Sequence, residues 1–590
     1  MILIDSIRIA GFRGISSLEL FLQPMTVLLG TNNAGKTSIL KALQLAVGDY
    51  SRYLSDEDFF IGLNGVKASE IFVDLRIVPV NESGSRALAF TESWATEFGD
   101  KIKSEADGKQ FVALRTRSKQ NQIKGGFDTL RYSMERWPAF ESWTTERNKE
   151  TRLSSRLLCI PVIPIEAQRD IHYELRERSS FVGRVLSGVS YDEGDVEALE
   201  ELIREVNDQA VAKSAELVLL KKHLSGLAMS FSGGGKAELN PLPKKVRDLS
   251  KNFSVSFGDS AESTFSMEYH GMGTRSWASL LTVKAFAEIA CGKHEREAEP
   301  FFPIITAEEP EAHLHPNAQR TLYHQLSSTP GQVIVSTHSP YLAGMADVMS
   351  IRSVSRTVAG CKVSAVAYQM SPDEKNMLSR EIVNKRADIL FSKALILCEG
   401  VTEEQIIPSL FEIYSGSPMC EFGVSCISVG GKNYAPFIKL ACSLGIPVYI
   451  VSDNDGNTQA EIEAQLRNVK SESKLTLAGD LFGVSYLSAG NDFEVELFSV
   501  LRLRSEVVEA LVKCETKGSS NVNWVTAKRA EINAFTDAAV LTRMGELKAS
   551  YSGFLGDVLK KNDANRTVDQ RIPIAVLDAF KQIKEWLRHD

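Results

Sequence analysis

The order of apolar and polar residues predicts a chain that mixes β-strands and α-helices. Apolar and polar residues alternate over Ile2 to Leu22 around an FRG turn, which predicts two strands, and Ile71 to Val80 predicts another. From about Ile171 to Lys222 the apolar period becomes helical. One apolar stripe of this stretch consists of Leu199, Leu202, Val206 and Ala210. The closing segment, Ile574 to Leu587, has the same period and predicts a packing helix.

A glycine-rich loop lies between a predicted strand and a predicted helix. Gly30 to Ser38, GTNNAGKTS, matches the phosphate-loop pattern GxxxxGKT, with the apolar run Met25 to Leu29 before it and the helical run Ile39 to Val47 after it. Glycines allow consecutive amide groups to face one anion, and the following helix adds its positive end. We expect Lys36 to neutralise the β and γ phosphates and the Thr37 hydroxyl to bind Mg²⁺. The predicted nucleotide-binding residues of this loop are Gly30, Asn32, Asn33, Gly35, Lys36, Thr37 and Ser38. The loop therefore predicts a site for ATP.

Length and composition indicate several globular domains. The chain has 590 residues, of which 43% are hydrophobic and 24% charged, and this length is too great for one core. No apolar run is long enough to span a bilayer, and the N-terminus lacks the features of a signal peptide, so we expect a cytoplasmic protein with no membrane association. The eight cysteines are scattered without a CxxC pair, which indicates reduced core residues rather than disulfides or a zinc site.

The charge of the chain bears on nucleic-acid binding. A net charge of −8 argues against a protein that coats nucleic acid by bulk charge, although a local basic groove remains compatible with it. Residues 101–126 contain a basic group in a predicted strand and loop: Arg115, Arg117, Lys119 and Lys124. Because a charge run is usually a solvated face, contact with DNA is the second interpretation of this group.

Two later segments supply the remaining parts of an ATP site. Residues 301–305 predict a strand that leads to Glu308 and Glu309. One carboxylate at such a strand end can hold Mg²⁺ through water and the next can orient the attacking water, so we assign Glu308 and Glu309 to these roles in that order. Two glutamates before a helix more often just favour its N-terminus, but the order of the motifs favours the catalytic interpretation. A second predicted strand lies within Val333 to Leu342, VIVSTHSPYL, and it is followed by a loop that contains His338.

These segments together carry a resemblance. The phosphate loop, the glycine-rich turn HGMGTRS at His270 to Ser276, EEPEAHLHP and STHSP occur in the order that is typical of the ABC-type ATPases of the SMC and recombination-protein group, and the chain resembles that group. The resemblance implies that His338 senses the γ-phosphate and that two heads dimerise, with the signature turn of one facing the nucleotide of the other. HGMGTRS departs from the usual Ser-Gly-Gly core of that turn.

A second chemical centre is predicted in the last third of the chain. Acidic residues follow three further predicted strands: Glu399 and Glu403 after Ala394 to Cys398, Asp453 and Asp455 after Ile446 to Val451, and Asp492 and Glu494 after Val484 to Leu487. Because the carboxyl ends of parallel strands meet at one edge of a sheet, we expect these side chains to converge. Acidic oxygens without nearby His or Cys favour hard cations, Mg²⁺ or Mn²⁺. Two such ions can activate water and stabilise the leaving oxygen of a phosphodiester.

The acidic motifs resemble those of a known domain. EGVTEE after one strand and DND after the next resemble the Toprim domain, in which Glu399, Asp453 and Asp455 occupy the matching positions. The resemblance implies that Glu403, Asp492 and Glu494 serve a second ion, and that a late lysine helps to stabilise the pentavalent phosphate. Lys548 is the candidate for that lysine, and Lys432 competes with it. Catalysis would then depend on Glu309 in the ATPase and on Glu399, Asp453 and Lys548 in the Toprim domain.

The combination of the two domains is similar to the OLD family of ATP-dependent nucleases. It implies an α/β fold: an ABC/SMC-like ATPase head in two parts, 1–170 and 246–385, a helical insertion over 171–245 that is a candidate for dimerisation, and a Rossmann-like Toprim domain with C-terminal helices over 386–590. The Gabija-type and retron-associated defence nucleases share this plan, which implies a role against phage and a possible helicase or retron-type partner.

Three hypotheses follow for the function. The leading one is an ATP-regulated, divalent-metal-dependent DNA endonuclease that acts as a homodimer or a higher homo-oligomer. The alternative is an ATP-driven clamp or sensor that binds DNA without cutting it. A topoisomerase or primase would keep the metal site but needs a nucleophilic tyrosine module or a polymerising apparatus, and we identify neither in the sequence.

Overall fold

A computed structural model gives the fold of most of the chain. It describes residues 1–121, 125–146, 148–166, 180–181, 192–215, 217–218, 256–257, 265–266, 269–357, 360–366, 370–378, 380, 386–472, 481–561 and 566–588. Much of the predicted insertion, 171–245, lies outside these residues, as does Lys124. Among the described helices, none combines the length and the apolar character that crossing a membrane would need.

The N-terminal strands form an antiparallel sheet that carries no predicted catalytic residue. Its order is β2-β1-β4-β6-β7-β8, and β5 pairs with β6. The strands are β1 (Ile2–Phe12), β2 (Ile15–Phe21), β4 (Glu70–Pro79), β5 (Ile102–Ser104), β6 (Gln110–Gln120), β7 (Phe127–Met134) and β8 (Glu150–Arg152). The helix α2 (Glu92–Phe98) lies between β4 and β5 in the chain. The predicted strands on either side of the FRG turn are present, and β1 pairs with β2 from Ser6 opposite Phe21 to Phe12 opposite Ile15.

A second, mostly parallel sheet builds the nucleotide site. Its order is β15-β14-β3-β13-β12-β9, and only the pair β14–β15 is antiparallel among the described strands. The strands are β3 (Met25–Leu29), β9 (Val162–Ile165), β12 (Ile304–Glu308), β13 (Gln332–Ser336), β14 (Ile351–Thr357) and β15 (Gly360–Ala365). The accompanying helices are α1 (Lys36–Ala46), α8 (Met272–Arg296), α9 (Pro316–Ser327) and α10 (Pro340–Ala343). Apolar residues of α1 and of both sheets form one buried cluster, so α1 is held between the sheets.

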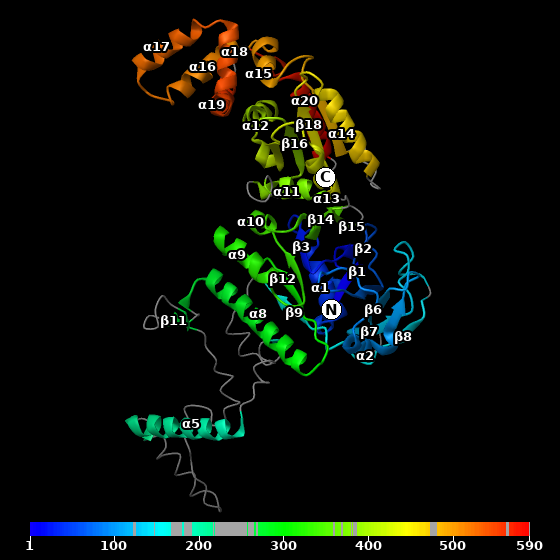
Figure 1. Cartoon of the computed structure of the whole chain (residues 1–590). Helices are drawn as coiled ribbons and strands as arrows, with labels where there is room; N and C mark the ends of the chain where they lie inside the picture. Colours follow the sequence, from blue (N-terminus) through cyan, green and yellow to red (C-terminus); the bar gives the residue numbers. More distant parts are fainter. Residues whose placement is uncertain are drawn as a thin grey trace, which may run out of the picture.

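The last third of the chain folds around a parallel sheet of order β17-β16-β18-β19, which lies beyond the ATPase sheets in Figure 1. The strands are β16 (Ala394–Cys398), β17 (Val424–Ser428), β18 (Val448–Ser452) and β19 (Phe482–Tyr486). The helices are α11 (Pro372–Leu378), α12 (Val401–Ser415), α13 (Ala435–Leu444), α14 (Thr458–Glu472), α15 (Phe493–Val495), α16 (Arg504–Glu515), α17 (Val522–Asn533), α18 (Asp537–Glu546), α19 (Lys548–Lys561) and α20 (Ile574–Arg588). The predicted closing helix is therefore present as α20.

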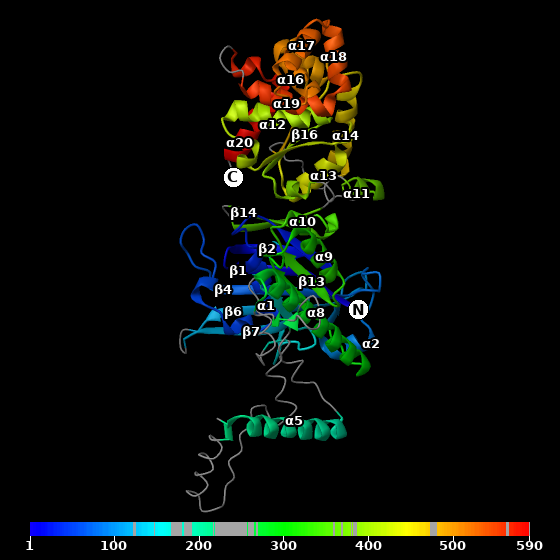
Figure 2. The same cartoon turned by 90° about the vertical axis from the view of Figure 1, so that its left-hand side faces the viewer.

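The buried residues of β16 divide between two apolar clusters. Ala394, Ile396 and Cys398 pack with α12, α16, α19 and α20 on one face. Leu395 and Leu397 pack on the other face in a cluster that continues into the ATPase sheet through β3, β12 and β13. This alternation is the period of a strand that is buried on both faces. One continuous apolar core thus joins the ATPase and the C-terminal sheet, whose arrangement is seen from two sides in Figures 1 and 2.

The predicted apolar stripe of the insertion is wrong. The helix α5 (Glu193–Lys213) lies in that stretch, but Leu202 and Val206 are 57% and 51% exposed, whereas Ile203, Asn207 and Val211 are buried. The buried stripe is displaced by one residue, or about 100° around the helix. Because this stripe includes a polar residue, apolar content alone selects the wrong face.

The DNA-contact interpretation of the basic group is wrong for Arg115. Its side chain is 1% exposed and donates to Asp74 at 2.6 Å and to Glu150 at 3.0 Å. Arg117 also pairs with Glu150, at 2.8 Å, while Lys119 is exposed. Arg115, Arg117 and Lys119 share one face of β6, and Arg115 is the one that the Trp143 segment covers, since it donates to the Trp143 carbonyl at 2.6 Å. A cation buried in this way requires carboxylate partners.

Candidate functional site

The strand order brings the predicted ATP-site residues to one edge of the parallel sheet. Strand β13 lies between β3 and β12, and Ser336 pairs in register with Leu28 on one side and with Glu308 on the other. The phosphate loop follows β3, and His338 follows β13. The carboxyl ends of adjacent parallel strands are where open α/β sheets bind ligands.

The phosphate loop has the backbone that the motif requires. Gly30 and Gly35 have φ angles of 153° and 114°. A Cβ on Gly30 would lie 2.1 Å from the carbonyl oxygen of Val354, so a side chain is excluded there by β14 as well. Asn32 and Asn33 are exposed, and Asn33 has a φ of 63°. Ser38 is buried in the first turn of α1.

Lys36 is held inside this loop. Its ammonium donates to the carbonyl oxygens of Gly30 at 2.8 Å and Thr31 at 3.0 Å, and it lies 2.7 Å from Nε2 of His338. Burial lowers the pKa of Lys36, against the opposing effect of nearby glutamates. Burial and the Lys36 charge also lower the pKa of His338, which favours a neutral ring that accepts from Lys36. The two residues predicted to contact the β and γ phosphates are thus neighbours.

The paired carboxylates occupy different positions. The hydroxyl of Thr37 donates to Glu308, which joins the two groups predicted to serve Mg²⁺. Glu309 lies 3.3 Å from Nε2 of His338 and its side chain is 43% exposed. Glu309 has a φ of 42°, which is uncommon for a residue with a side chain and is typical of functional sites. Glu308 therefore lies beside Thr37, the other residue predicted to serve Mg²⁺, and Glu309 lies beside the group predicted to meet the γ-phosphate.

Glu311 is a site residue that the sequence reasoning missed. Its Oε1 accepts from the Thr337 hydroxyl at 2.5 Å and from the amides of His338 at 3.0 Å and Ser339 at 3.2 Å. Burial raises its pKa. These bonds fix the loop that presents His338. The third glutamate of EEPEAHLHP was the sequence signal that could have identified Glu311. Its hydrogen-bond partners, however, are 26 or more residues away in the chain.

The predicted signature turn leads into α8 and contacts the same region. Gly271 precedes the first residue of α8, and a Cβ on Gly273 would lie 2.4 Å from the carbonyl oxygen of His313. Gly273 thus allows the turn to approach the loop that follows Glu308 and Glu309. The adjacent Tyr269 and Met272 are 82% and 45% exposed.

The acidic residues of the C-terminal sheet also converge at strand ends. Strand β16 pairs in parallel with β18, and β18 with β19, so Glu399, Asp453 and the loop that carries Asp492 follow neighbouring strands. Two backbone hydrogen bonds between Asn454 and residues 490–491, of 2.9 and 3.0 Å, tie the last two loops together. The expected convergence at one sheet edge is therefore present.

Asp453 and Glu399 form the centre of this acidic site. Asp453 Oδ1 and Glu399 Oε2 are buried and have no hydrogen-bond partner among the described residues. Burial, followed by the charges of Glu403, Glu399, Asp492 and Glu494, raises the pKa of Asp453 to about 8. Burial also raises the pKa of Glu399. Buried carboxylate oxygens without partners are costly unless a cation binds them.

Glu403 and Glu494 lie on the side of the site formed by α12 and α15. Both are almost fully buried, at 6% and 5% exposure. Glu494 Oε1 accepts from the Thr402 hydroxyl at 2.9 Å and lies 3.4 Å from the Lys548 ammonium. Burial raises the pKa of Glu403 to about 7. Thr402 was missed in the sequence because its partner is 92 residues away.

Asp455 and Asp492 have partners of their own. Asp455 accepts from the hydroxyl of Thr458 at 2.7 Å and lies 3.1 Å from the Lys432 ammonium. The Thr458 and Lys432 hydrogen bonds lower the pKa of Asp455. Asp492 accepts from the amide of Val495 at 2.8 Å and caps α15.

The two candidate lysines occupy different places at the rim. Lys432 lies beside Asp455, and Lys548 lies beside Glu494. The charge of each acts on Glu399, where it opposes the effect of burial on the pKa. Two lysine side chains are therefore close enough for their charges to act on the centre of the acidic site.

The residues at this site fit a divalent cation. The donors are carboxylate oxygens, two of them buried and without partners among the described residues, which is the donor set of Mg²⁺ or Mn²⁺. Within the described part of the chain, the one group of three candidate ligands whose atoms all lie within 4.8 Å is His294, Glu297 and Glu299. That group is on the surface, and His294 already pairs with Glu299 at 3.0 Å. Among the described residues, no three ligand atoms of the acidic site meet that spacing.

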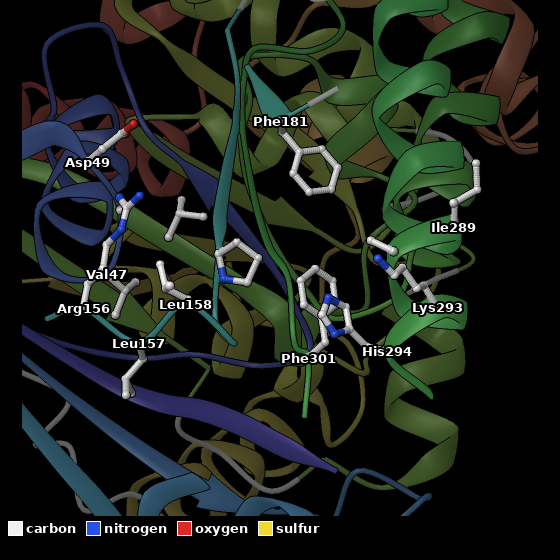
Figure 3. Close-up of a pocket in the computed structure, with 14 residues that line it drawn as sticks. Val47, Asp49, Arg156, Leu157, Leu158, Phe181, Ile289, Lys293, His294 and Phe301 are labelled. Atoms are coloured by element: carbon white, nitrogen blue, oxygen red, sulfur yellow. The ribbon is translucent and has the colours of Figure 1, made fainter. Parts of the chain in front are cut away.

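A hollow of about 450 Å³ lies elsewhere, between the end of α1 and the second half of α8 (Figure 3). It is mostly apolar, with Ile289, Phe301 and Leu158 among its walls and Arg156 and Lys293 as its cations. None of the predicted catalytic, nucleotide-binding or metal-binding residues lines it. We therefore assign the chemistry to the two sheet edges and not to this hollow.

Comparison with known proteins matches both parts of the chain to family models. Residues 390–455 match a model described as "Overcoming lysogenization defect protein-like, TOPRIM domain". Residues 25–344, more than half of the chain, match the AAA_21 model, described as "AAA domain, putative AbiEii toxin, Type IV TA system".

Three relatives extend over most of the chain. An OLD nuclease of Thermus scotoductus is 25% identical over 77% of this chain and 82% of the relative. The Old nuclease of Escherichia phage P2 is 22% identical over 76% of this chain and 77% of the relative. Endonuclease GajA of Bacillus cereus is 21% identical over 76% of this chain and 75% of the relative. The chain therefore belongs to the AAA_21 family, and it joins this ATPase to a C-terminal segment that matches an OLD-like Toprim domain.

Proposed function

We propose that this protein is an ATP-regulated, divalent-metal-dependent DNA endonuclease. The observation that carries the proposal is the pair of buried, unpartnered carboxylate oxygens on Glu399 and Asp453, at the ends of two adjacent parallel strands. The names of the relatives, two OLD nucleases and an endonuclease, support the same reaction.

The reaction is hydrolysis of a phosphodiester. A water oxygen forms a bond to phosphorus while the bond to the sugar oxygen breaks, and that oxygen leaves with the bonding electrons and takes up a proton. Bound Mg²⁺ or Mn²⁺, two ions in this proposal, supplies an activated water and charge stabilisation at the leaving oxygen. Glu399 and Asp453 would hold the central cation, and Glu403, Asp455, Asp492 and Glu494 would complete the set. Lys548 would neutralise charge on the phosphate from its place beside Glu494.

The ATPase is proposed to control this reaction. ATP would bind through Lys36 and Thr37, with Glu308 on its Mg²⁺ and Glu309 on the attacking water. Support comes from the packing: α10 begins two residues after His338 and contacts the turn Ala387–Phe391, which leads into β16 and Glu399. A change at His338 can therefore reach Glu399 through one continuous core.

The proposed partners follow from the relatives and from the exposed surfaces of the chain. DNA is the substrate. A homodimer or higher homo-oligomer would use two exposed residues, Tyr269 just before the signature turn and Met272 within it, and the exposed side of α5. The 171–245 insertion would be the dimerisation element between head segments 1–170 and 246–385. We propose the cytoplasm and a role against phage, with a helicase or retron-type protein as a possible further component.

A plasmid assay tests the proposal. Supercoiled plasmid is incubated with the full chain and Mg²⁺ or Mn²⁺, and Asp453→Asn and Glu399→Gln are compared with Glu463→Gln, whose exposed carboxylate lies on α14 outside the site. We expect nicking by the wild type and the control and none by the two site variants. Nicking at the wild-type rate by Asp453→Asn contradicts the assignment, and the clamp alternative gains support if ATP-dependent DNA retention occurs without cutting.

A further inference from the structure

A buried tyrosine on α19, near the acidic site, has no assigned role. Tyr551, on α19, is 0% exposed, and its hydroxyl has no hydrogen-bond partner among the described residues. Burying a hydroxyl without a partner is unfavourable, so such a group calls for an explanation. The ring packs into the apolar cluster around α12, which explains why the ring is buried but not why a hydroxyl is buried with it.

The packing of α19 on α12 sets where Tyr551 lies. The Ser552 hydroxyl bonds to Gln405 at 2.5 Å, and a Cβ on Gly556 would lie 2.6 Å from the Ser409 hydroxyl. Contacts of 405 with 552 and of 409 with 556 mean that the helices run in the same direction. Their N-terminal ends therefore lie together, and the end of α12 carries Glu403.

Two observations indicate that Tyr551 lies on the side of α19 near the acidic ligands. Lys548 precedes Tyr551 by three residues, hence on the same face of α19, and its ammonium is 3.4 Å from Glu494. Burial, followed by the charges of Glu494, Glu403 and Asp492, raises the pKa of Tyr551. A phenol hydroxyl is a donor at neutral pH, so Tyr551 brings a donor with no partner among the described residues into the neighbourhood of these carboxylates.

We propose that Tyr551 is a positioning residue of the acidic site, whose hydroxyl donates a hydrogen bond to the Glu403 and Glu494 carboxylates when they hold a cation. This inference rests on the proposed metal-dependent function. A carboxylate that binds a cation keeps lone pairs that can accept, and donors behind metal ligands set their orientation. Tyr551 would act through Glu403 and Glu494 and would not touch the DNA.

The test measures metal binding apart from cutting. Mn²⁺ is titrated into the full chain without nucleotide or DNA, and free Mn²⁺ is followed by electron paramagnetic resonance. The variants are Tyr551→Phe and, as a matched control, Tyr486→Phe, whose hydroxyl on β19 is also buried without a described partner but is near Glu463. Asp453→Asn gives the background from surface sites.

We expect Tyr551→Phe to bind Mn²⁺ about 10- to 100-fold more weakly than the wild type, and Tyr486→Phe to bind it unchanged. Titrations run well below the unfolding midpoint of each variant, so partial unfolding does not enter the comparison. Wild-type affinity in Tyr551→Phe, or equal weakening in Tyr486→Phe, overturns the inference. Tight binding by the wild type without DNA cleavage overturns the nuclease proposal alone, whereas wild-type binding no stronger than the Asp453→Asn background overturns both.

Discussion

Replacing Asp453 with asparagine should stabilise the metal-free protein. Burial and the charges of four neighbouring carboxylates raise the pKa of Asp453 from 3.8 to about 8. The folded state therefore binds this proton more tightly than the unfolded state does. The stabilisation of the folded state by this tighter proton binding is complete below about pH 4 and is lost as the pH rises through about 8. Asparagine has nearly the same shape and carries no charge at any pH.

The magnitude follows from the size of the shift. A change of about 4 pKa units at about 1.36 kcal/mol each sets an upper limit of about 6 kcal/mol at pH 8. Solvent at the rim and the coupled titration of Glu403 reduce this, so we expect about 2 kcal/mol. For a folding unit of the size of the Toprim domain, 386–590, a gain of about 2 kcal/mol raises the Tm by about 4–8 °C.

Thermal unfolding with EDTA, at pH 8.5 and at pH 5, measures the effect. We expect Asp453→Asn to gain stability at pH 8.5 and clearly less at pH 5, where the carboxyl of the folded wild type is protonated and only that of the unfolded state is ionised. Excess Mg²⁺ at pH 8.5 should raise the Tm of the wild type and leave the variant almost unchanged. An unchanged or lower Tm of Asp453→Asn at pH 8.5, or the same gain at both pH values, would refute the reasoning.

Three further predictions concern other parts of the molecule. Arg115→Met should lower the free energy of unfolding in urea by about 3–5 kcal/mol because it leaves Asp74 buried and unpaired. Arg117→Met, at the more exposed position, should lower it by less than about 1 kcal/mol. Equal losses in the two variants would contradict this reasoning. Glu309→Gln should slow ATP hydrolysis about 100-fold or more in a phosphate-release assay while binding of a fluorescent ATP analogue persists, and unchanged hydrolysis would remove its assigned role. Lys548→Met should lower the rate of plasmid nicking about 100-fold with little change in ATP hydrolysis, and an unaffected nicking rate would exclude it as the lysine that acts on the phosphate.

The strand ends were predictable because strong local signals mark them. Short runs of apolar residues precede the phosphate loop, the two glutamates at the end of β12 and the acidic residues after β16 and β18. Parallel pairing of the strands makes the convergence of these residues a geometric consequence. Nothing further was needed to expect two sites at two sheet edges.

Roles that depend on distant contacts were not predictable. Glu311 holds the loop of His338, and Thr402 bonds to Glu494 across 92 residues. Tyr551 is an ordinary core aromatic in sequence, and only the packing of α19 on α12 brings its hydroxyl to the acidic site. A single sequence contains no local signal for such pairings.

The two wrong interpretations have a related cause. Arg115 is in a basic run but points inward on β6, where Asp74 and Glu150 neutralise it. The apolar stripe of α5 was placed one residue away from the buried face because the buried face includes Asn207. In both cases the direction of a side chain was set by its tertiary partners and not by its polarity.

The central claim is that cutting is done at the acidic site of the Toprim domain and controlled from the phosphate loop. The most direct measurement is the initial rate of plasmid nicking with Mg²⁺ or Mn²⁺, with and without ATP, for the wild type, Asp453→Asn and Lys36→Ala. The account predicts that Asp453→Asn does not cut, that ATP changes the wild-type rate, and that Lys36→Ala cuts at a rate that ATP does not change. Nicking by Asp453→Asn at the wild-type rate would contradict it.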